Sequence, residues 1–281
     1  MSSHIDRCFA AALVAEVAAT TAEKSQKPRP VEQGALADAR RVLRSFNTWT
    51  FKREQPSDPQ LMLRVLEKSL AAQRPISFVL YWGKGPRHTA AWPEAQCLDF
   101  LAALAGRVQS TYARGAAITL ILTDTHAELN GHSPRDIKRY FDDIRLEAQR
   151  RGFETRLLSA LVRSAANLTS ETPVNNVASP KVLASLTASA SKWYRGTATP
   201  EEGALAYLRM NLIEQQVVER VFPNSIFITF NGSQLRLLFP RRLPIFYMYS
   251  LRRGTSVKPW FLPAEPIAIR LAGQSSILAD S

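Results

Sequence analysis

A polar segment between two apolar stretches of the chain carries the side chains best suited to chemistry. Residues 123–132 read Thr-Asp-Thr-His-Ala-Glu-Leu-Asn-Gly-His and directly follow an apolar run. Asp124 is the first chargeable group after that run, so it is a candidate to act in catalysis or to bind a substrate amine. His126 is a candidate general base, because imidazole titrates near neutral pH. Asn130 is a candidate to hydrogen-bond the substrate.

Two other interpretations of this segment stay open. The Asp-x-His spacing, with His132 further along, is compatible with a metal site, although ligand spacing of this kind is weak support. Asp124 and Asn130 are also typical of turns, where their side chains bond to nearby backbone groups. We favour the catalytic interpretation and predict neither a metal nor a cofactor.

A second polar segment follows the preceding apolar run and is basic. It reads Trp82-Gly-Lys-Gly-Pro-Arg87, in which the glycines allow close backbone approach. Lys84 and Arg87 are candidates to hold a phosphate or a carboxylate. The glycine spacing matches neither a P-loop nor a dinucleotide-binding fingerprint. A flexible basic loop without a ligand is the alternative.

A third set of polar groups lies on a long helix that should begin after Thr199. Thr199-Pro200-Glu201-Glu202 has the residues of a capped helix start. Arg209 and Glu214 are polar on a helix with a long apolar stripe, so they are candidates for the same site. A salt bridge on the surface is the alternative for both.

These segments need a scaffold that brings them together, and the apolar runs predict one. Residues 76–82 and 117–123 are short, nearly continuous apolar runs, as expected of strands covered on both faces. A helical pattern from Pro93 to about Leu104 separates them. This order predicts a parallel α/β sheet, whose ligands bind beyond the carboxyl ends of its strands.

Capping residues and periodicity predict the remaining elements. The helices expected are 1–22, 33–46, 58–72 with Asp58 as N-cap, one that starts at Ser133 and ends at Gly152, and 199–221. Strands are expected at 154–158, near an edge, and at 225–230, 243–250 and 267–271. Residues 164–199 should hold weak helices and form a lid. Asn231-Gly232 is typical of a hairpin turn.

Charge is the strongest signal in the composition. The net charge is +12, and part of it lies in arginine clusters. A polyanionic partner, either nucleic acid or a phosphorylated substrate, would explain it; a solvated surface is the alternative.

Only two cysteines occur, and Cys97 has apolar neighbours, so we expect no disulfide framework. No apolar run is long enough to span a membrane, and a cytoplasmic protein is expected. The oligomeric state cannot be inferred.

The order of several short motifs resembles the isonitrile synthase family, also called the pyoverdine/dityrosine biosynthesis family, from about Pro75 to Pro263. The segments are Tyr112-Ala-Arg-Gly-Ala116, Thr123-Asp124, Phe222-Pro-Asn224 and Thr255 to Trp260. The resemblance implies a three-layer Rossmann-like fold and an enzyme that converts an amino acid's amino group to an isonitrile with carbon from ribulose 5-phosphate. Asp124 would then bind the amine, His126 would move protons, and Lys84 with Arg87 would grip the phosphosugar.

The chain departs from that family where chemistry is expected. Thr125-His126 replaces a Gly-Arg after the aspartate, Phe227 and Asn231 stand where an Arg and a His are typical, and Phe261 replaces a His. The resemblance therefore supports the scaffold and the position of Asp124 more than the reaction.

A second resemblance is to the tRNA-dependent cyclodipeptide synthases, which are also Rossmann-like and basic. Tyr207 and Glu214 are loosely similar to that family's Tyr and Glu helix motif, and the arginine clusters would bind tRNA. Their catalytic serine has no counterpart at the end of the first core strand. A non-catalytic binding protein on the same fold is the third hypothesis. In each case we expect an N-terminal helical region at 1–72 and a Rossmann-like domain at 73–281.

Overall fold

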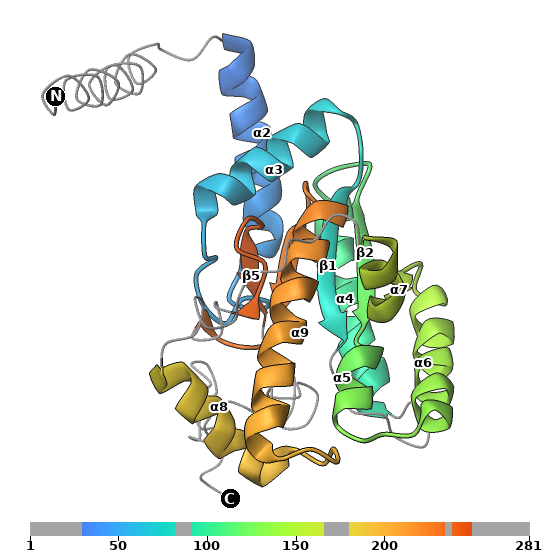
Figure 1. Ribbon diagram of the computed structural model, residues 1–281. Helices are drawn as coiled ribbons and strands as arrows, with labels where there is room; N and C mark the ends of the chain where they lie inside the picture. The colour runs from blue at the N-terminus through green and yellow to red at the C-terminus, as the bar shows by residue number, and fades with distance from the viewer. Residues whose placement is uncertain (1–29, 83–91, 166–179, 234–237, 249–281) are drawn as a thin grey trace, which may run out of the picture.

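The chain folds around a parallel sheet whose strand order differs from the sequence order. The computed structural model describes residues 30–82, 92–165, 180–233 and 238–248 (Figure 1). Its strands pair in the order β3-β2-β1-β4-β5, and every pair is parallel. Their bounds are β1 (Ile76–Trp82), β2 (Ala116–Leu122), β3 (Glu154–Leu157), β4 (Ile226–Thr229) and β5 (Ile245–Tyr247).

The two central strands confirm the parallel sheet predicted from sequence. Ile76 pairs with Ala116 and Trp82 pairs with Leu122, so both strands end at the same level. Their runs are almost wholly apolar because helices cover both faces of the sheet. β3, with exposed and half-buried residues in alternation, lies at one edge as expected.

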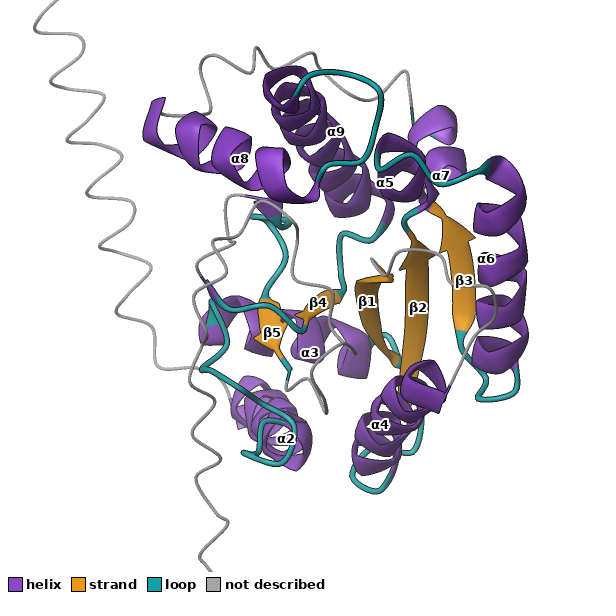
Figure 2. Cartoon of the chain, turned by 90° about the horizontal axis from the view of Figure 1, so that it is seen from below, coloured by secondary structure: helices purple, strands orange, loops and turns teal. Residues whose placement is uncertain are grey.

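Helices form a layer on each side of the sheet, which confirms the three-layer Rossmann-like architecture (Figure 2). One layer holds α2 (Pro30–Phe46), α3 (Pro59–Ala71), α4 (Trp92–Gln109) and α6 (Pro134–Gln149). The other holds α7 (Leu158–Ser164), α8 (Pro180–Trp193) and α9 (Pro200–Val221). The short α5 (Asp124–Leu129) lies at the carboxyl end of the sheet and contacts α6, α7 and α9. No helix among the described residues is both long enough and apolar enough to cross a membrane.

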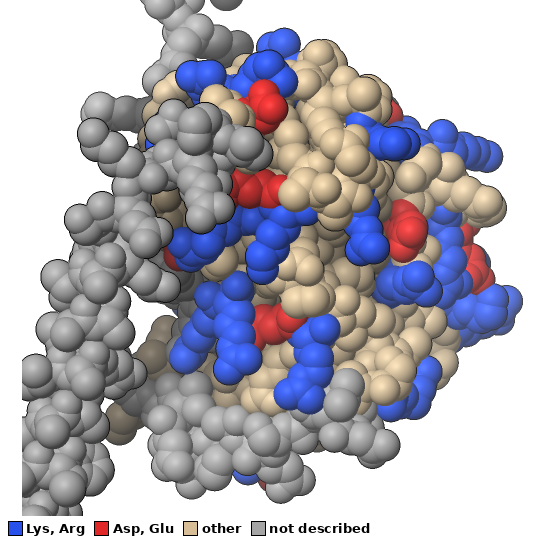
Figure 3. All heavy atoms as spheres, turned by 90° about the horizontal axis from the view of Figure 1, so that it is seen from above, with Lys and Arg blue, Asp and Glu red and all other residues tan. Residues whose placement is uncertain are grey.

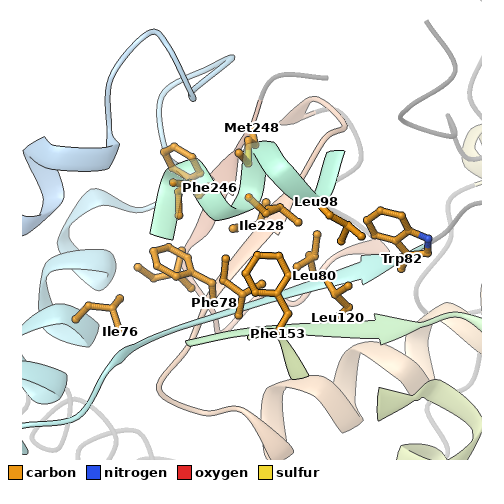
Figure 4. Packing of buried hydrophobic residues seen from close by; sticks show 14 of the residues in the cluster. Ile76, Phe78, Leu80, Trp82, Leu98, Leu120, Phe153, Ile228, Phe246 and Met248 are labelled. Atoms are coloured by element: carbon orange, nitrogen blue, oxygen red, sulfur yellow. The ribbon is translucent and has the colours of Figure 1, made fainter. Parts of the chain in front are cut away.

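The first layer shares one hydrophobic core with the sheet (Figure 4). Alternate residues of β1, namely Phe78, Leu80 and Trp82, face this core and are at most 2% exposed. Phe46, the last residue of α2, packs edge-on against Phe78 and Phe246, with ring centroids 5.4 Å apart in both pairs. α2 and α3 therefore contribute to the core of the sheet itself.

The second layer buries the alternate residues of the same strands. Val79, Ile121 and Phe227 point to this face and are completely buried. They pack against α7, α8 and α9, and α9 supplies Leu208 and Val218. The strands thus hold α9 firmly along the sheet, which fixes the position of the polar groups on that helix.

Residues 52–57 run along the outer side of β5. The Arg53 N–H donates to the Tyr247 carbonyl at 2.8 Å, and the Ser57 N–H donates to the Ile245 carbonyl at 3.1 Å. The Ile245 N–H in turn donates to Ser57 Oγ at 3.0 Å. Three of the outer hydrogen-bonding groups of β5, the Ile245 N–H and carbonyl and the Tyr247 carbonyl, are therefore satisfied within the chain.

Three helix starts confirm the capping residues read from the sequence. Asp58 and Ser133 accept bonds from the backbone N–H groups three residues ahead, and each precedes a proline. Thr199 forms a full capping box with Glu202: Thr199 Oγ1 accepts from the Glu202 N–H at 3.2 Å, and the Glu202 carboxylate accepts from the Thr199 N–H at 2.9 Å. These bonds satisfy N–H groups that have no partner within the helix.

Replacing Thr199 by alanine should lower the melting temperature by about 2–4 °C, because one cap bond is lost from the start of α9. The bonds from Thr199, the backbone bond first, lower the pKa of Glu202 below its ordinary value. The stabilisation is therefore present above the usual carboxyl range and is lost as pH falls through the lowered pKa. Melting curves from pH 7 to pH 3 should show the difference between the two proteins narrow, because the bond from the Thr199 hydroxyl to the Glu202 carboxylate is lost in acid, but not vanish, because the bond from the Glu202 N–H to Thr199 Oγ1 does not titrate. Equal melting temperatures at pH 7 would contradict the capping box.

Some sequence predictions were wrong. Residues 124–129 form a helix, α5, where a loop was expected. The Asn231-Gly232 pair does not join a hairpin, because β4 and β5 are parallel and the connection must cross back along the sheet. α4 extends five residues beyond Leu104, to Gln109. The helix expected at 1–22 and the strand expected at 267–271 lie outside the described residues, as do residues 166–179 of the proposed lid; Pro180–Trp193 of that segment is α8.

Candidate functional site

The polar groups of the site gather where β1 and β2 end. α5 begins at Asp124, two residues after β2, and lies against the middle of α9. α9 starts at the carboxyl end of the sheet and runs back along it, as Figure 1 shows. The crossing of these two helices brings residues 125–126 beside residue 214. The carboxyl end of a parallel sheet is the usual ligand-binding position in such folds.

Glu214 is the centre of this cluster. Its side chain is 1% exposed and carries two short hydrogen bonds: Thr125 Oγ1 donates to Oε1 at 2.8 Å, and His126 Nε2 lies 2.7 Å from Oε2. A buried carboxylate is costly unless each oxygen has a partner, and here both do. Glu214 therefore holds the His126 ring in one orientation.

The pairing also selects a role for each ring nitrogen of His126. A carboxylate beside Nε2 favours the tautomer with the proton on that nitrogen, which leaves the lone pair on Nδ1. Within the described residues, no group hydrogen-bonds to Nδ1. The side chain is 16% exposed, so one part of the ring is reachable from outside. A ring oriented in this way can accept a proton from a bound molecule.

Tyr207 forms one wall of the cluster. Its ring stands perpendicular to the His126 ring, with centroids 5.3 Å apart. Asn211, one turn further along α9, donates from its side chain to the Tyr207 carbonyl at 2.7 Å. Burial, followed by the nearby Glu214 charge, raises the pKa of Tyr207 far above its ordinary value. Tyr207 is thus a neutral hydrogen-bonding group at any physiological pH.

Tyr81 is a member of the cluster that sequence reasoning missed. It lies next to the end of β1, its ring packs edge-on against Phe227, and its hydroxyl oxygen is buried without a hydrogen-bond partner among the described residues. Burial raises its pKa well above the ordinary value, and the charge of Glu214 adds to the effect. The available signal was a polar tip at the end of an apolar strand, at the level where ligands bind.

The two raised pKa values predict the response to alkali. Tyr81 and Tyr207 should keep their protons well above pH 10, near which exposed tyrosine ionises. Stability should therefore fall as pH rises past about 10, because the unfolded chain then binds fewer protons than the folded one. Tyrosinate absorbance should include a late step that coincides with loss of circular dichroism. Tyr81→Phe and Tyr207→Phe should each shrink that step; an early, fully reversible titration would contradict the burial.

Asp124 is held in place by α7. Its side chain is 6% exposed; Oδ1 accepts from the Ser159 N–H at 3.0 Å and Oδ2 accepts from the Ser159 hydroxyl. The first turn of α7 has no side-chain cap of its own, since Leu157 is its N-cap residue. Asp124 supplies that cap from a distant part of the chain, which ties α7 to α5.

The remaining predicted site residues lie in different places. Asn130 ends α5 and donates to the His126 carbonyl at 2.8 Å, so it caps a helix end beside the cluster. Arg209 is exposed on α9, and no ion pair joins it to Glu214. Lys84 and Arg87 lie outside the described residues. Among the residues that are described, no group of three His, Cys, Asp or Glu side chains is arranged to hold a metal ion.

Comparison with known proteins supports the fold. No family model and no curated protein sequence matches the chain. The crystal structure of the PvcA protein from Pseudomonas aeruginosa is similar over 80% of this chain and 88% of that chain, with 18% identity and a TM-score of 0.57. At this identity the likeness establishes a shared fold.

Two weaker likenesses were found. Tyrosyl-tRNA synthetase from Pyrococcus horikoshii, complexed with L-tyrosine, matches over 71% of this chain and 52% of that chain (12% identity, TM-score 0.44). Cyclo(L-leucyl-L-phenylalanyl) synthase matches over 64% and 92% (14% identity, TM-score 0.38). The likeness to PvcA agrees with the Rossmann-like fold that the first resemblance implies.

Proposed function

We propose that this chain is an enzyme that acts on the amino group of an amino acid, in the manner of the isonitrile synthases. The observation that carries the proposal is the buried Glu214 carboxylate, bonded to Thr125 and His126 where β1 and β2 end. The sequence resemblance and the likeness to PvcA in fold support the same class. A histidine oriented by a buried carboxylate is a common arrangement for proton transfer.

The chemistry of this reaction suits such a pair. A primary amine that becomes an isonitrile loses both of its N–H hydrogens, so a proton acceptor must stand beside the nitrogen. In this proposal His126 accepts through Nδ1 while Glu214 stabilises the resulting imidazolium. The substrate ammonium binds near Asp124, whose oxygens each keep one acceptor position after the bonds from Ser159. Tyr81 and Tyr207 lie beside Glu214 and would flank the bound amino acid, and Lys84 with Arg87 would hold the phosphosugar.

A direct test is to incubate the full chain with ribulose 5-phosphate and each common amino acid, and to follow products by mass spectrometry. We expect one amino acid to be consumed together with the sugar phosphate, giving the isonitrile. Heat-denatured protein and His126→Gln are the controls. If the amino acid and sugar phosphate remain unchanged at high protein concentration, isonitrile formation is excluded.

A second candidate is a synthase that takes its aminoacyl group from tRNA. The observation in its favour is that Tyr207 and Glu214, which both lie on α9, each contact His126. Incubation with charged tRNA would then release cyclic dipeptide or free amino acid faster than buffer does. Turnover with charged tRNA but not with free amino acids would select this candidate. Failure of both assays would favour a non-catalytic binding protein.

A further inference from the structure

A groove lies at the opposite end of the sheet from the candidate site. It has a volume of about 390 Å³ and runs between the connection from α3 to β1 and the connection from α9 to β4. Ser77 and Ser225, hydrogen-bonded to each other at 2.7 Å, are among its lining residues, at the starts of the two strands. This volume is within the range of small-ligand pockets.

The groove has one basic wall and one apolar wall. Lys68, in the last turn of α3, and Arg74, just before β1, form the first; both are exposed. Neither makes an ion pair or a side-chain hydrogen bond with the described residues. Val221, Phe222 and Pro223 form the second wall, and Val221 is 40% exposed. Cations opposite apolar and aromatic surface suit a ligand that is anionic on one side and flat on the other.

More positive charge surrounds the groove. Arg114 lies two residues before β2, as Arg74 lies two residues before β1, and the Tyr112 hydroxyl donates to the Arg74 carbonyl at 3.0 Å, which holds the two loops together. Arg220 lies beside Val221 at the end of α9. Figure 3 shows this end of the molecule, where there are more Lys and Arg side chains than acidic ones, although acidic side chains lie among them. Cations are therefore in excess on a face that lies at the opposite end of the sheet from His126.

We propose that this groove binds the phosphate and base of a nucleotide, presented by a single-stranded nucleic acid or by a free nucleotide. Lys68 and Arg74 would contact phosphate, and Phe222 would offer its ring to the base, the two contacts that combine in single-strand binding. The spread of cations beyond the groove, to Arg114 and Arg220, favours a strand over a single nucleotide. The site is separate from the candidate catalytic cluster and does not depend on its activity.

The competing explanation is purely structural. Lys68 and Arg220 lie in the last turns of α3 and α9, where cations stabilise the partial negative charge of a helix end. In that case their removal would change stability without changing the binding of nucleic acid. The two explanations therefore predict different results for the same variants.

The experiment measures fluorescence anisotropy of a labelled single-stranded oligouridylate RNA with the full-length protein, at several salt concentrations. The double variant Lys68→Gln/Arg74→Gln should bind at least tenfold more weakly at low salt. Its slope of log affinity against log salt should be shallower by about 1.4, since each phosphate contact on a single strand contributes about 0.7. Phe222→Leu, which keeps the apolar contact but removes the ring, should weaken binding about tenfold.

A matched control removes the same charge elsewhere. Arg135→Gln/Lys192→Gln changes two exposed cations, one at the start of α6 and one at the end of α8. It should leave the affinity within about twofold. Competition by uridine monophosphate would identify a free nucleotide as the ligand, and its failure to compete would identify a strand. Equal losses in both double variants, or no measurable RNA binding, would overturn the proposal. Circular dichroism melting checks that each variant is folded.

Discussion

Replacing Phe46 by alanine is expected to lower the free energy of unfolding by about 3–5 kcal/mol, the usual cost of removing a fully buried aromatic side chain. Phe46 is 0% exposed and packs edge-on against Phe78 of β1 and Phe246 of β5. No polar atom is lost, so the effect comes from the cavity and the missing ring contacts. Urea denaturation followed by circular dichroism measures it.

The matched control is Trp49→Ala, an aromatic truncation three residues further on. Trp49 is 64% exposed, and its ring contacts the Lys52 ammonium at 4.5 Å. Its removal should cost about 1 kcal/mol or less. Two separate unfolding transitions, with only one affected by Phe46→Ala, would mean that the helical region before residue 73 folds as a separate domain. A single transition would mean that α2 and α3 fold with the sheet.

The second large effect is expected on catalysis. Once a turnover assay exists, His126→Gln should lower kcat/KM by about 10²–10⁴, the range for loss of a general acid or base. Glu214→Gln keeps the shape of the side chain but removes the charge that orients the ring and stabilises the imidazolium. It should reduce kcat by a similar factor. Because the two residues act as one unit, the double variant should be little worse than either single variant.

The same helix provides a control for Glu214. Arg209 is exposed, so Arg209→Gln should leave kcat/KM within about twofold.

Asp124→Asn should lower both activity and melting temperature, because the amide weakens the cap that Asp124 gives to Ser159. Additive losses in the His126/Glu214 cycle would show that the hydrogen bond between them has no catalytic role. Unchanged activity in Asp124→Asn would remove that residue from the site.

Local sequence signals predicted the elements with local causes. The runs at 76–82 and 117–123 had to be buried strands, because a seven-residue apolar run is too short for an isolated buried helix and too apolar for one exposed face. The starts of α3, α6 and α9 were predicted because the capping side chain lies within three residues of its partner. α5 was missed because its six residues, four polar and two apolar, are too few to show a helical apolar period.

The site itself depends on contacts that no local pattern encodes. His126 and Glu214 are 88 residues apart in the chain and meet only because α9 lies across α5. Arg209 and Glu214 looked equivalent on one helix, yet the rotation of α9 buries the second and exposes the first. The bond from Ser159 to Asp124 also spans two elements. Predicting such pairs requires the packing of the second helical layer, which the sequence leaves open.

The segment at residues 52–57 has a consequence for how the protein behaves in concentrated solution. A bare outer strand offers a row of free N–H and C=O groups to which a neighbouring molecule can add its own strand, the first step toward fibrous aggregates. Here Arg53 and Ser57 already occupy those positions on β5. Further copies could extend the sheet at that edge only after this segment had dissociated from β5.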